Sequence, residues 1–99
     1  MILEIAKFSV VPGLEAEFEA GVQLAVPLFR TARGCLGMEI FRSVDTYGSY
    51  RLIVRWETLE NHTVDFRGSD DFLKWRRLIS RFATGPLDVD NTAPLGVGF

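Results

Sequence analysis

The residues best suited to chemistry lie in one stretch of the chain, from Trp56 to Phe82. His62 is the only histidine, and histidine is the side chain that gains and loses a proton near neutral pH in its ordinary state. Arg76 lies further along the same stretch and keeps its positive charge at any physiological pH. A base close to a fixed cation can remove a proton from a substrate and stabilise the anion that results. His62 and Arg76 are therefore the candidate catalytic residues.

Aromatic and cationic side chains recur in this stretch at helical spacing, as in His62 and Phe66 or Phe72 and Arg76. Residues four apart share one face of a helix, so the pattern predicts an apolar wall that carries a few polar groups. Such a wall is typical of a pocket for a small apolar or aromatic molecule. The alternative is that the aromatic residues only form the core of the domain, as an amphipathic helix face usually does. The candidate substrate-binding residues are Phe8, Trp56, Phe66, Phe72 and Trp75.

Patterns for other kinds of chemistry are missing from the sequence. Cys35 is the only cysteine, which excludes an internal disulfide and a cysteine-based metal site. The carboxylates do not follow a calcium-loop spacing, and no glycine-rich phosphate loop is present. We therefore expect no metal site and no cofactor.

Length and composition limit the possible partners. Ninety-nine residues with 47% hydrophobic side chains predict one globular domain, residues 1–99. A net charge of −2 argues against nucleic-acid binding. No apolar run approaches the roughly 18 residues that a membrane helix needs. The single cysteine favours the reducing cytoplasm. A small domain this apolar is also expected to bury surface in a homodimer.

The elements that must position these residues follow from the hydrophobic pattern. It predicts a strand over 2–11, a helix over 14–33, and a hairpin of strands over 36–43 and 49–57. Pro27 should kink or split the first helix, because it cannot donate to the carbonyl of Gln23. A helical run with a break at Gly68 follows, and then a short strand over 87–91.

The order β-α-β-β-α-β predicts a ferredoxin-like α+β fold, with a four-stranded antiparallel sheet and helices on one face. Both faces of the first strand are largely apolar, so the second face is expected to pack against a second copy of the chain. The apolar tail TAPLGVGF is expected to lie against that copy as well. Arg51 and Arg55 on the second hairpin strand are expected to pair with Glu39 across the hairpin.

Several segments together resemble the antibiotic biosynthesis monooxygenase family. They are the first strand closed by Pro12-Gly13, LEAEFEA, GCLGMEIFRS, and RLIVRWETLENHTVDFRGSDDFLKWRRLI. The resemblance implies a dimeric α+β barrel with a cavity between the sheet and the helices of each subunit. It also implies one of several activities, because the family includes cofactor-independent oxygenases, haem-degrading enzymes and an isomerase of a phosphorylated sugar-derived signal.

The resemblance can be tested at single positions. The haem-degrading members carry an asparagine, a tryptophan and a histidine where this chain has Ala6, Phe66 and Arg76, and a guanidinium does not ligate haem. Haem degradation is therefore not expected. Many members carry a histidine at the position of Phe66, whereas this chain carries His62 one helical turn earlier, on about the same face.

The first hypothesis is thus a cofactor-independent monooxygenase of a small aromatic or quinol-type substrate, with His62 as the base and Arg76 as the anion-holding group. The second is a non-catalytic dimeric module that binds a small ligand or serves as a stress-associated protein, since no unambiguous catalytic set is present. A third, isomerase or lyase action on an oxo-acid or sugar derivative, needs phosphate-binding groups that the sequence does not reveal.

Overall fold

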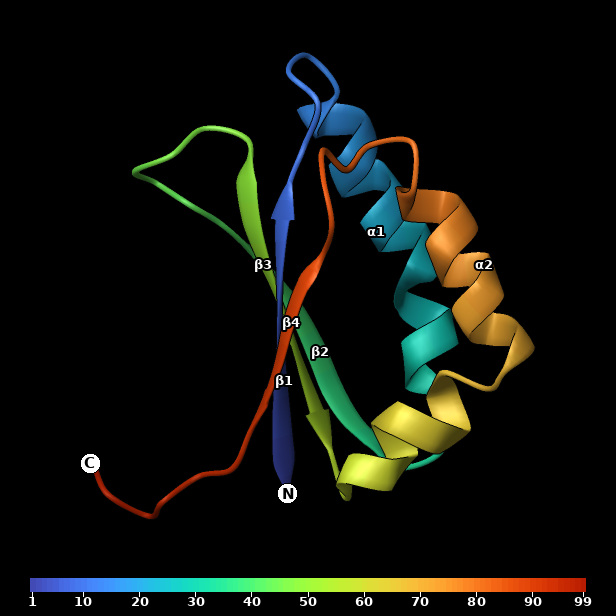
Figure 1. The fold of residues 1–99 in the computed structure, drawn as a ribbon, viewed down its shortest axis with the longest axis vertical. Coiled ribbons are helices and arrows are strands. Elements are labelled where there is room, and N and C mark those ends of the chain that lie inside the picture. The colour runs from blue at the N-terminus through green and yellow to red at the C-terminus, as the bar shows by residue number, and fades with distance from the viewer.

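The chain folds into one antiparallel sheet with its helices on one face (Figure 1). The computed structural model describes residues 1–99, and the strand order across the sheet is β2-β3-β1-β4. This arrangement is the ferredoxin-like α+β fold that the sequence predicts. The elements in chain order are β1 (Ile2–Ser9), α1 (Glu15–Arg30), β2 (Cys35–Arg42), β3 (Ser49–Trp56), η1 (Asn61–Phe66), α2 (Asp70–Ile79) and β4 (Asp88–Thr92).

Strand β1 lies in the middle of the sheet and pairs with β3 on one side and β4 on the other. Successive residues of a strand point to opposite faces. Ala6 and Phe8 accordingly point toward the helices and are buried, whereas Lys7 points to the other face and is exposed. The side chains that cover the helix-facing side of β3 are likewise buried: Tyr50, Leu52, Val54 and Trp56.

Helix α1 is not split at Pro27, contrary to one outcome that the sequence suggested. The proline lies within the last turn of the helix, where only the bond to the carbonyl of Gln23 is lost. The Thr31 hydroxyl donates to the carbonyl of Pro27 over 3.0 Å and closes this end of the helix. At the other end, the Glu15 carboxylate accepts from the backbone N–H of Gly13, over 3.0 Å at its shorter distance.

The predicted helical run after β3 is a short π-helix, η1, and not an α-helix. A π-helix is rare and is frequently found at functional sites. The chain breaks at Gly68, and α2 then begins after Ser69, whose side chain accepts from the N–H of Phe72 over 3.2 Å. This break separates the two helical pieces that face the sheet.

The core between the sheet and the helices is mainly aromatic. The Phe18 ring lies 4.8 Å from that of Tyr50 and 5.5 Å from that of Phe8. The Trp75 ring packs edge-on against Phe8 and Phe29, at 6.1 and 5.1 Å. Such tilted and edge-on contacts are the arrangements that aromatic pairs favour. These contacts tie α1, α2 and the inner face of the sheet together.

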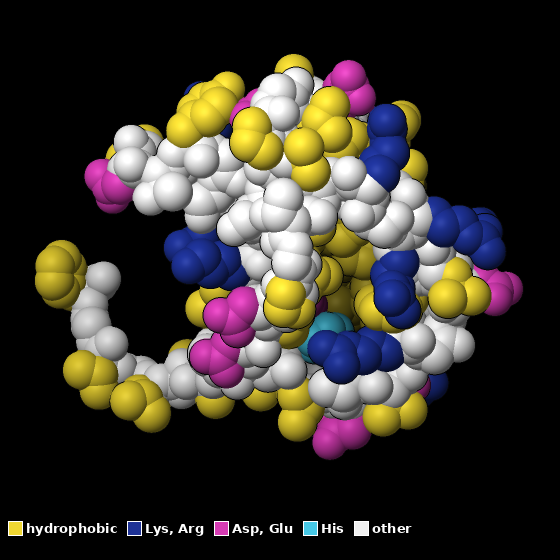
Figure 2. Space-filling view, turned by 45° about the horizontal axis from the view of Figure 1, so that its top comes forward, with side chains coloured by type: hydrophobic (Ala, Val, Ile, Leu, Met, Phe, Trp, Pro, Cys, Tyr) yellow, Lys and Arg dark blue, Asp and Glu magenta, His cyan; other side chains and the backbone are white.

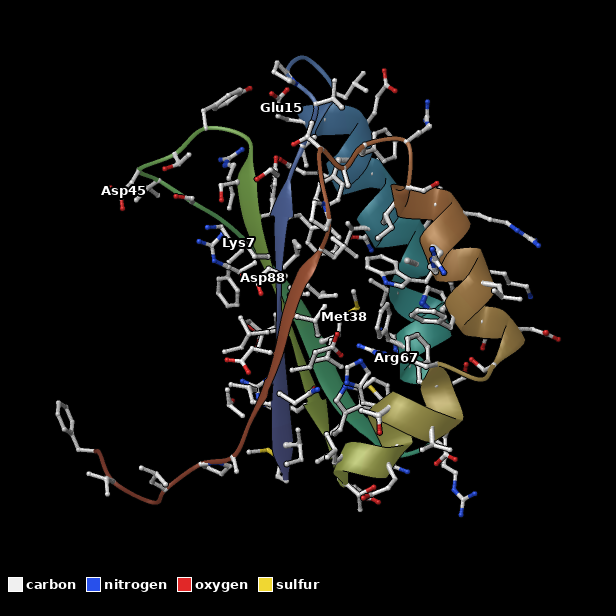
Figure 3. All side chains as sticks on the ribbon, viewed as in Figure 1. Lys7, Glu15, Met38, Asp45, Arg67 and Asp88 are labelled. Carbon is white, nitrogen blue, oxygen red and sulfur yellow. The ribbon has the colours of Figure 1, made fainter.

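The outer face of the sheet has no element over it. It mixes half-buried Leu3, Ile5 and Ile53 with charged side chains, and it is less apolar than the first strand alone suggests. Arg55 pairs with Glu39 over 2.9 Å, as the sequence predicts. Arg51 instead donates to the hydroxyl of its neighbour Ser49. Lys7 and Asp88 are seen on this outer side of the sheet in Figure 3.

The C-terminal residues 93–99 leave the body of the domain as an extended arm (Figure 1). Leu95 and Val97 are about 90% exposed, and Phe99 is completely exposed. Three apolar side chains in water are unfavourable for an isolated chain. Among the helices, none has both the length and the apolar character needed to cross a bilayer.

Candidate active site

A cavity of about 460 Å³ lies between the inner face of the sheet and the helical pieces η1 and α2. Its volume is within the usual range for small-molecule sites. Most of its lining is apolar, and four charged or titratable residues interrupt that lining. We call it the central cavity; it is lined by Glu4, Ala6, Phe8, Leu52, His62, Arg67, Phe72, Trp75, Arg76, Leu87 and Val89.

One wall of the central cavity holds a buried polar network. Oε1 of Glu4 accepts a hydrogen bond from the Trp56 indole N–H over 3.0 Å and lies 3.3 Å from Nε2 of His62. Nδ1 of His62 lies 2.8 Å from the amide oxygen of Asn91. The imidazole also stacks on the Trp56 indole, with an angle of 12° between the rings. Contacts on three sides fix the ring in one orientation.

Three elements bring this network together. Glu4 and Asn91 are direct partners in the pairing of β1 with β4, and both point inward. Trp56 ends β3 on the other side of β1. The π-helix then carries His62 across the ends of these strands, where it is only 3% exposed. The site therefore depends on the strand pairing as much as on the helical stretch.

The hydrogen bonds restrict where a proton can move. The amide oxygen of Asn91 faces Nδ1, so a proton on Nδ1 is donated to Asn91. Nε2 faces Oε1 of Glu4 over 3.3 Å. Oε1 of Glu4 accepts from Trp56 and faces His62, whereas Oε2 has no partner in the protein. Since no fully buried side-chain oxygen lacks a partner, Oε2 is the accessible atom that Glu4 offers to the cavity.

The structure brings five of the seven sequence-predicted residues together around the central cavity. Trp56 and Phe66 lie behind the wall and do not line it. Trp56 holds Glu4 and His62, whereas Phe66 packs against Trp56 with ring centres 5.4 Å apart. The five that line the cavity are Phe8, His62, Phe72, Trp75 and Arg76.

Two guanidinium groups line the outer part of the cavity. Arg67 follows η1, Arg76 lies on α2, and both are exposed, in contrast to the buried Glu4 and His62. Figure 2 shows basic side chains and the histidine around a hollow with an apolar interior. The carboxylate of Asp71, at the start of α2, pairs with Lys74 over 3.8 Å and not with Arg76.

Sequence reasoning missed three residues of the site: Glu4, Arg67 and Asn91. A signal for Glu4 was present, because it is the only charged residue in the inward-facing set of the first strand. Asn91 gave no such signal, since its role depends on pairing between the two ends of the chain.

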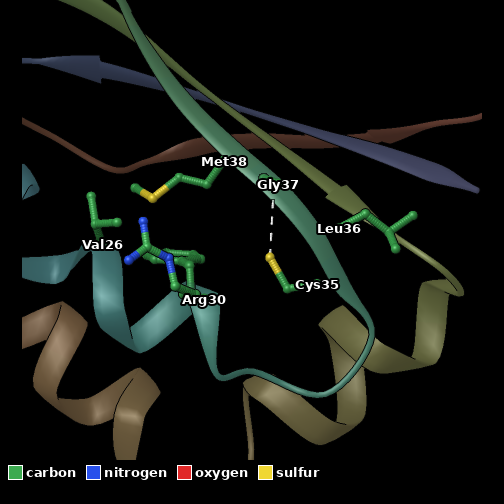
Figure 4. A pocket seen from close by; sticks show the side chains of 7 residues that line it. Val26, Arg30, Cys35, Leu36, Gly37 and Met38 are labelled. Carbon is green, nitrogen blue, oxygen red and sulfur yellow. Dashed lines mark hydrogen bonds between the residues drawn. The ribbon is translucent and has the colours of Figure 1, made fainter.

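A second cavity of about 280 Å³ lies between α1 and β2 and contains Cys35 (Figure 4). Burial raises the pKa of the Cys35 thiol, and the thiol lies 3.8 Å from the carbonyl of Gly37. A thiol with a raised pKa is a weak nucleophile at neutral pH. Arg30 is the only charged residue in this lining, so this cavity lacks a base near a cation.

Comparisons with known proteins agree with this architecture. Residues 1–78 match the family model described as antibiotic biosynthesis monooxygenase. A solved Bordetella bronchiseptica protein, described as a candidate member of that family, is 48% identical, with a TM-score of 0.92 over 95% of this chain and 96% of its own. The uncharacterised Bacillus subtilis protein YczJ is 37% identical over 85% of this chain and 88% of its own.

A more distant structure shares the fold. It is a variant of SnoaB, a cofactor-independent oxygenase from Streptomyces nogalater, which is 18% identical with a TM-score of 0.83 over 97% of this chain and 94% of its own. The match of the family model over most of the sequence, together with the two closer relatives, shows that the chain belongs to the antibiotic biosynthesis monooxygenase family.

Proposed function

We propose that this protein is a cofactor-independent monooxygenase that oxidises a small aromatic or quinol-type substrate in the central cavity. The observation that carries the proposal is the pair of Glu4 and His62, buried in the wall of an apolar cavity of about 460 Å³. Membership of the family supports the reaction class. The cavity supports the size and the apolar character of the substrate.

The first step is removal of a proton from a substrate hydroxyl or activated C–H group. The proton goes to Oε2 of Glu4, the atom of the pair that no protein group occupies. His62 stabilises the carboxylate from the other side and fixes its position. The sequence pointed to His62 itself as the base; in this proposal His62 acts through Glu4, because both ring nitrogens already face other side chains.

The second step uses the electrons of the deprotonated substrate. The anion passes one electron to O₂, and the substrate radical and superoxide combine to form a C–O bond. Loss of water from the protonated peroxide leaves a carbonyl. One oxygen atom thus enters the product, the other leaves as water, and the two hydrogens of that water come from the substrate.

The remaining residues of the cavity support this chemistry. Arg76 supplies a permanent positive charge for the substrate anion. Phe8, Phe72 and Trp75 hold an aromatic ring and exclude water, which strengthens the electrostatic interactions inside the cavity. Trp56 and Phe66 keep this wall rigid from behind.

The proposal includes a homodimer. The uncovered outer face of the sheet carries apolar Leu3, Ile5 and Ile53, and the exposed arm carries three more apolar side chains. A second copy of the chain that covers both would bury this surface.

The test is oxygen uptake with a panel of hydroquinones and anthrones. Glu4→Gln keeps an oxygen for the Trp56 N–H but removes the base, and kcat/KM should fall by about 10² to 10⁴-fold. Glu39→Gln, which changes a glutamate on the outer face of the sheet, is the matched control and should leave the rate unchanged.

Two outcomes would count against the proposal. If the natural protein consumes no oxygen above the uncatalysed rate with any member of the panel, the function is wrong. If it does, and Glu4→Gln oxidises the same substrate at an undiminished rate, the assignment of the base is wrong.

A non-catalytic ligand-binding module is the second candidate. The observation in its favour is that His62 is buried, with Nδ1 hydrogen-bonded to Asn91 and Nε2 facing Glu4, as in a purely structural histidine. This candidate predicts that ligands bind to the central cavity and leave it chemically unchanged.

A further inference from the structure

The central cavity carries more positive charge than the proposed reaction needs. Arg67 and Arg76 both line it, and neither belongs to any of the ion pairs of the protein. Arg67 lies in the space between the sheet and the helices in Figure 3. Two unpaired guanidiniums therefore border one apolar pocket, in a chain whose net charge is −2.

The other charges of the cavity do not neutralise these two arginines. Glu4 is its only acidic residue, and the Glu4 carboxylate is already matched by His62 and by the Trp56 N–H. Glu4 and His62 are buried, whereas the arginines are exposed near the opening. The site thus has a buried polar inner end, where the one carboxylate already accepts from the Trp56 N–H and faces His62, and a cationic outer end with two guanidiniums.

We propose that the natural ligand is an aromatic acid, with a flat apolar body and an ionised group such as a carboxylate at its outer end. Arg67 and Arg76 bind that group, while the body lies against Phe8, Phe72 and Trp75. Guanidinium groups suit such ligands because their donors match the two oxygens of a carboxylate. The inference rests on the proposed function only in placing the ligand in the same cavity.

The size of the effect follows from the exposure of the two arginines. Charges near the surface are screened by salt within about 10 Å at 0.1 M, so the gain for an anionic ligand is moderate. We expect it to bind about tenfold more tightly than a neutral ligand of the same shape at low salt. The preference should shrink as salt is added.

Two fluorescent probes with the same aromatic body test this directly. 1-Anilinonaphthalene-8-sulfonate carries one negative charge, and N-phenyl-1-naphthylamine carries none. Fluorescence titration should give the sulfonate a Kd about tenfold lower. In the double variant Arg67→Gln/Arg76→Gln, the two Kd values should become nearly equal.

Two control variants locate the effect. Arg77→Gln removes the neighbouring arginine of α2, which does not line the central cavity. Arg30→Gln removes the arginine of the second cavity, beside Cys35. Both controls should keep the preference for the sulfonate.

The inference is overturned if the natural protein binds neither probe, or binds the two equally. It is also overturned if the double variant keeps the preference, or if Arg77→Gln or Arg30→Gln abolishes it. Oxygen uptake separates this inference from the proposed function. Tight binding of acids without oxidation refutes only the function, whereas oxidation of neutral quinols by a protein without a preference for acids refutes only the inference.

Discussion

Glu4 is the residue that connects the central strand with the rest of the site. It is 7% exposed, and a buried carboxylate is stable only when donors surround it. The Trp56 N–H donates to it from β3, and Nε2 of His62 in η1 lies 3.3 Å from it. One carboxylate therefore fixes the relative positions of three elements and at the same time keeps one oxygen free toward the cavity.

Tyr50 is the second residue whose surroundings lead to a testable result. Its hydroxyl donates to Glu19 over 2.6 Å, and burial together with this bond raises its pKa to about 12 from an ordinary value of 10.0. The folded protein therefore keeps a proton above pH 10 that the unfolded chain loses. Stability should fall as the pH rises from 10 toward 12.

The substitution Tyr50→Phe should remove this part of the alkaline loss of stability. It should also cost about 1 kcal/mol at neutral pH, because the bond to Glu19 is lost. Urea unfolding at pH 8 and pH 11 measures both effects. Tyr47→Phe, at an 80% exposed residue of the hairpin loop, is the control and should behave like the natural protein. If Tyr50→Phe and the natural protein lose the same amount of stability between pH 8 and pH 11, the loss does not come from the raised pKa of Tyr50.

At the scale of elements, the loop after α1 packs tightly against the start of η1. Gly34 has a φ of +75°, and its carbonyl accepts from the N–H of Glu57 over 2.8 Å. A side chain at this position would collide with the amide of Asn61. That amide accepts from the backbone N–H and the hydroxyl of Thr58, so it cannot move without breaking those bonds.

Gly34→Ala should therefore destabilise the protein by about 3 kcal/mol, from backbone strain and from the displaced Asn61. Gly13→Ala is the matched control, because Gly13 also has a positive φ, of +92°, but has open space around it. It should cost only about 1 kcal/mol. Urea unfolding of both variants gives the comparison, and equal losses would show that contact with Asn61 is unimportant.

The elements also show how far the sequence could predict this protein. Period-two and helical patterns were enough to predict the sheet, the helices on one of its faces, and the inward direction of residues such as Phe8 and Trp56. These patterns could not predict that 61–66 forms a π-helix, because the hydrophobic periodicity of such a short run does not distinguish a π-helix from an α-helix. They also could not place Asn91 beside Glu4, because that contact depends on strand pairing between the two ends of the chain.

For the whole molecule, the uncovered sheet face and the apolar arm lead to a prediction about assembly. Sedimentation equilibrium at micromolar concentration should give a mass twice that of the 11.2 kDa chain. Deletion of residues 93–99 should weaken the dimer by at least about tenfold, because the arm would lose its contacts with the partner. The full-length variant with serine at Leu95, Val97 and Phe99 should show the same loss. A natural protein that sediments as a monomer would refute the dimer.

The position of Asn91 in β4 has a consequence for how the subunits depend on each other. The same short strand touches the imidazole of His62 at Asn91 and continues directly into the arm after Thr92. A neighbouring subunit that binds the arm would also restrict the motion of β4, which orients the His62 ring through Asn91. In the proposed dimer, contact between subunits would then influence the orientation of His62, and a separate subunit would hold the proposed pair of Glu4 and His62 less rigidly.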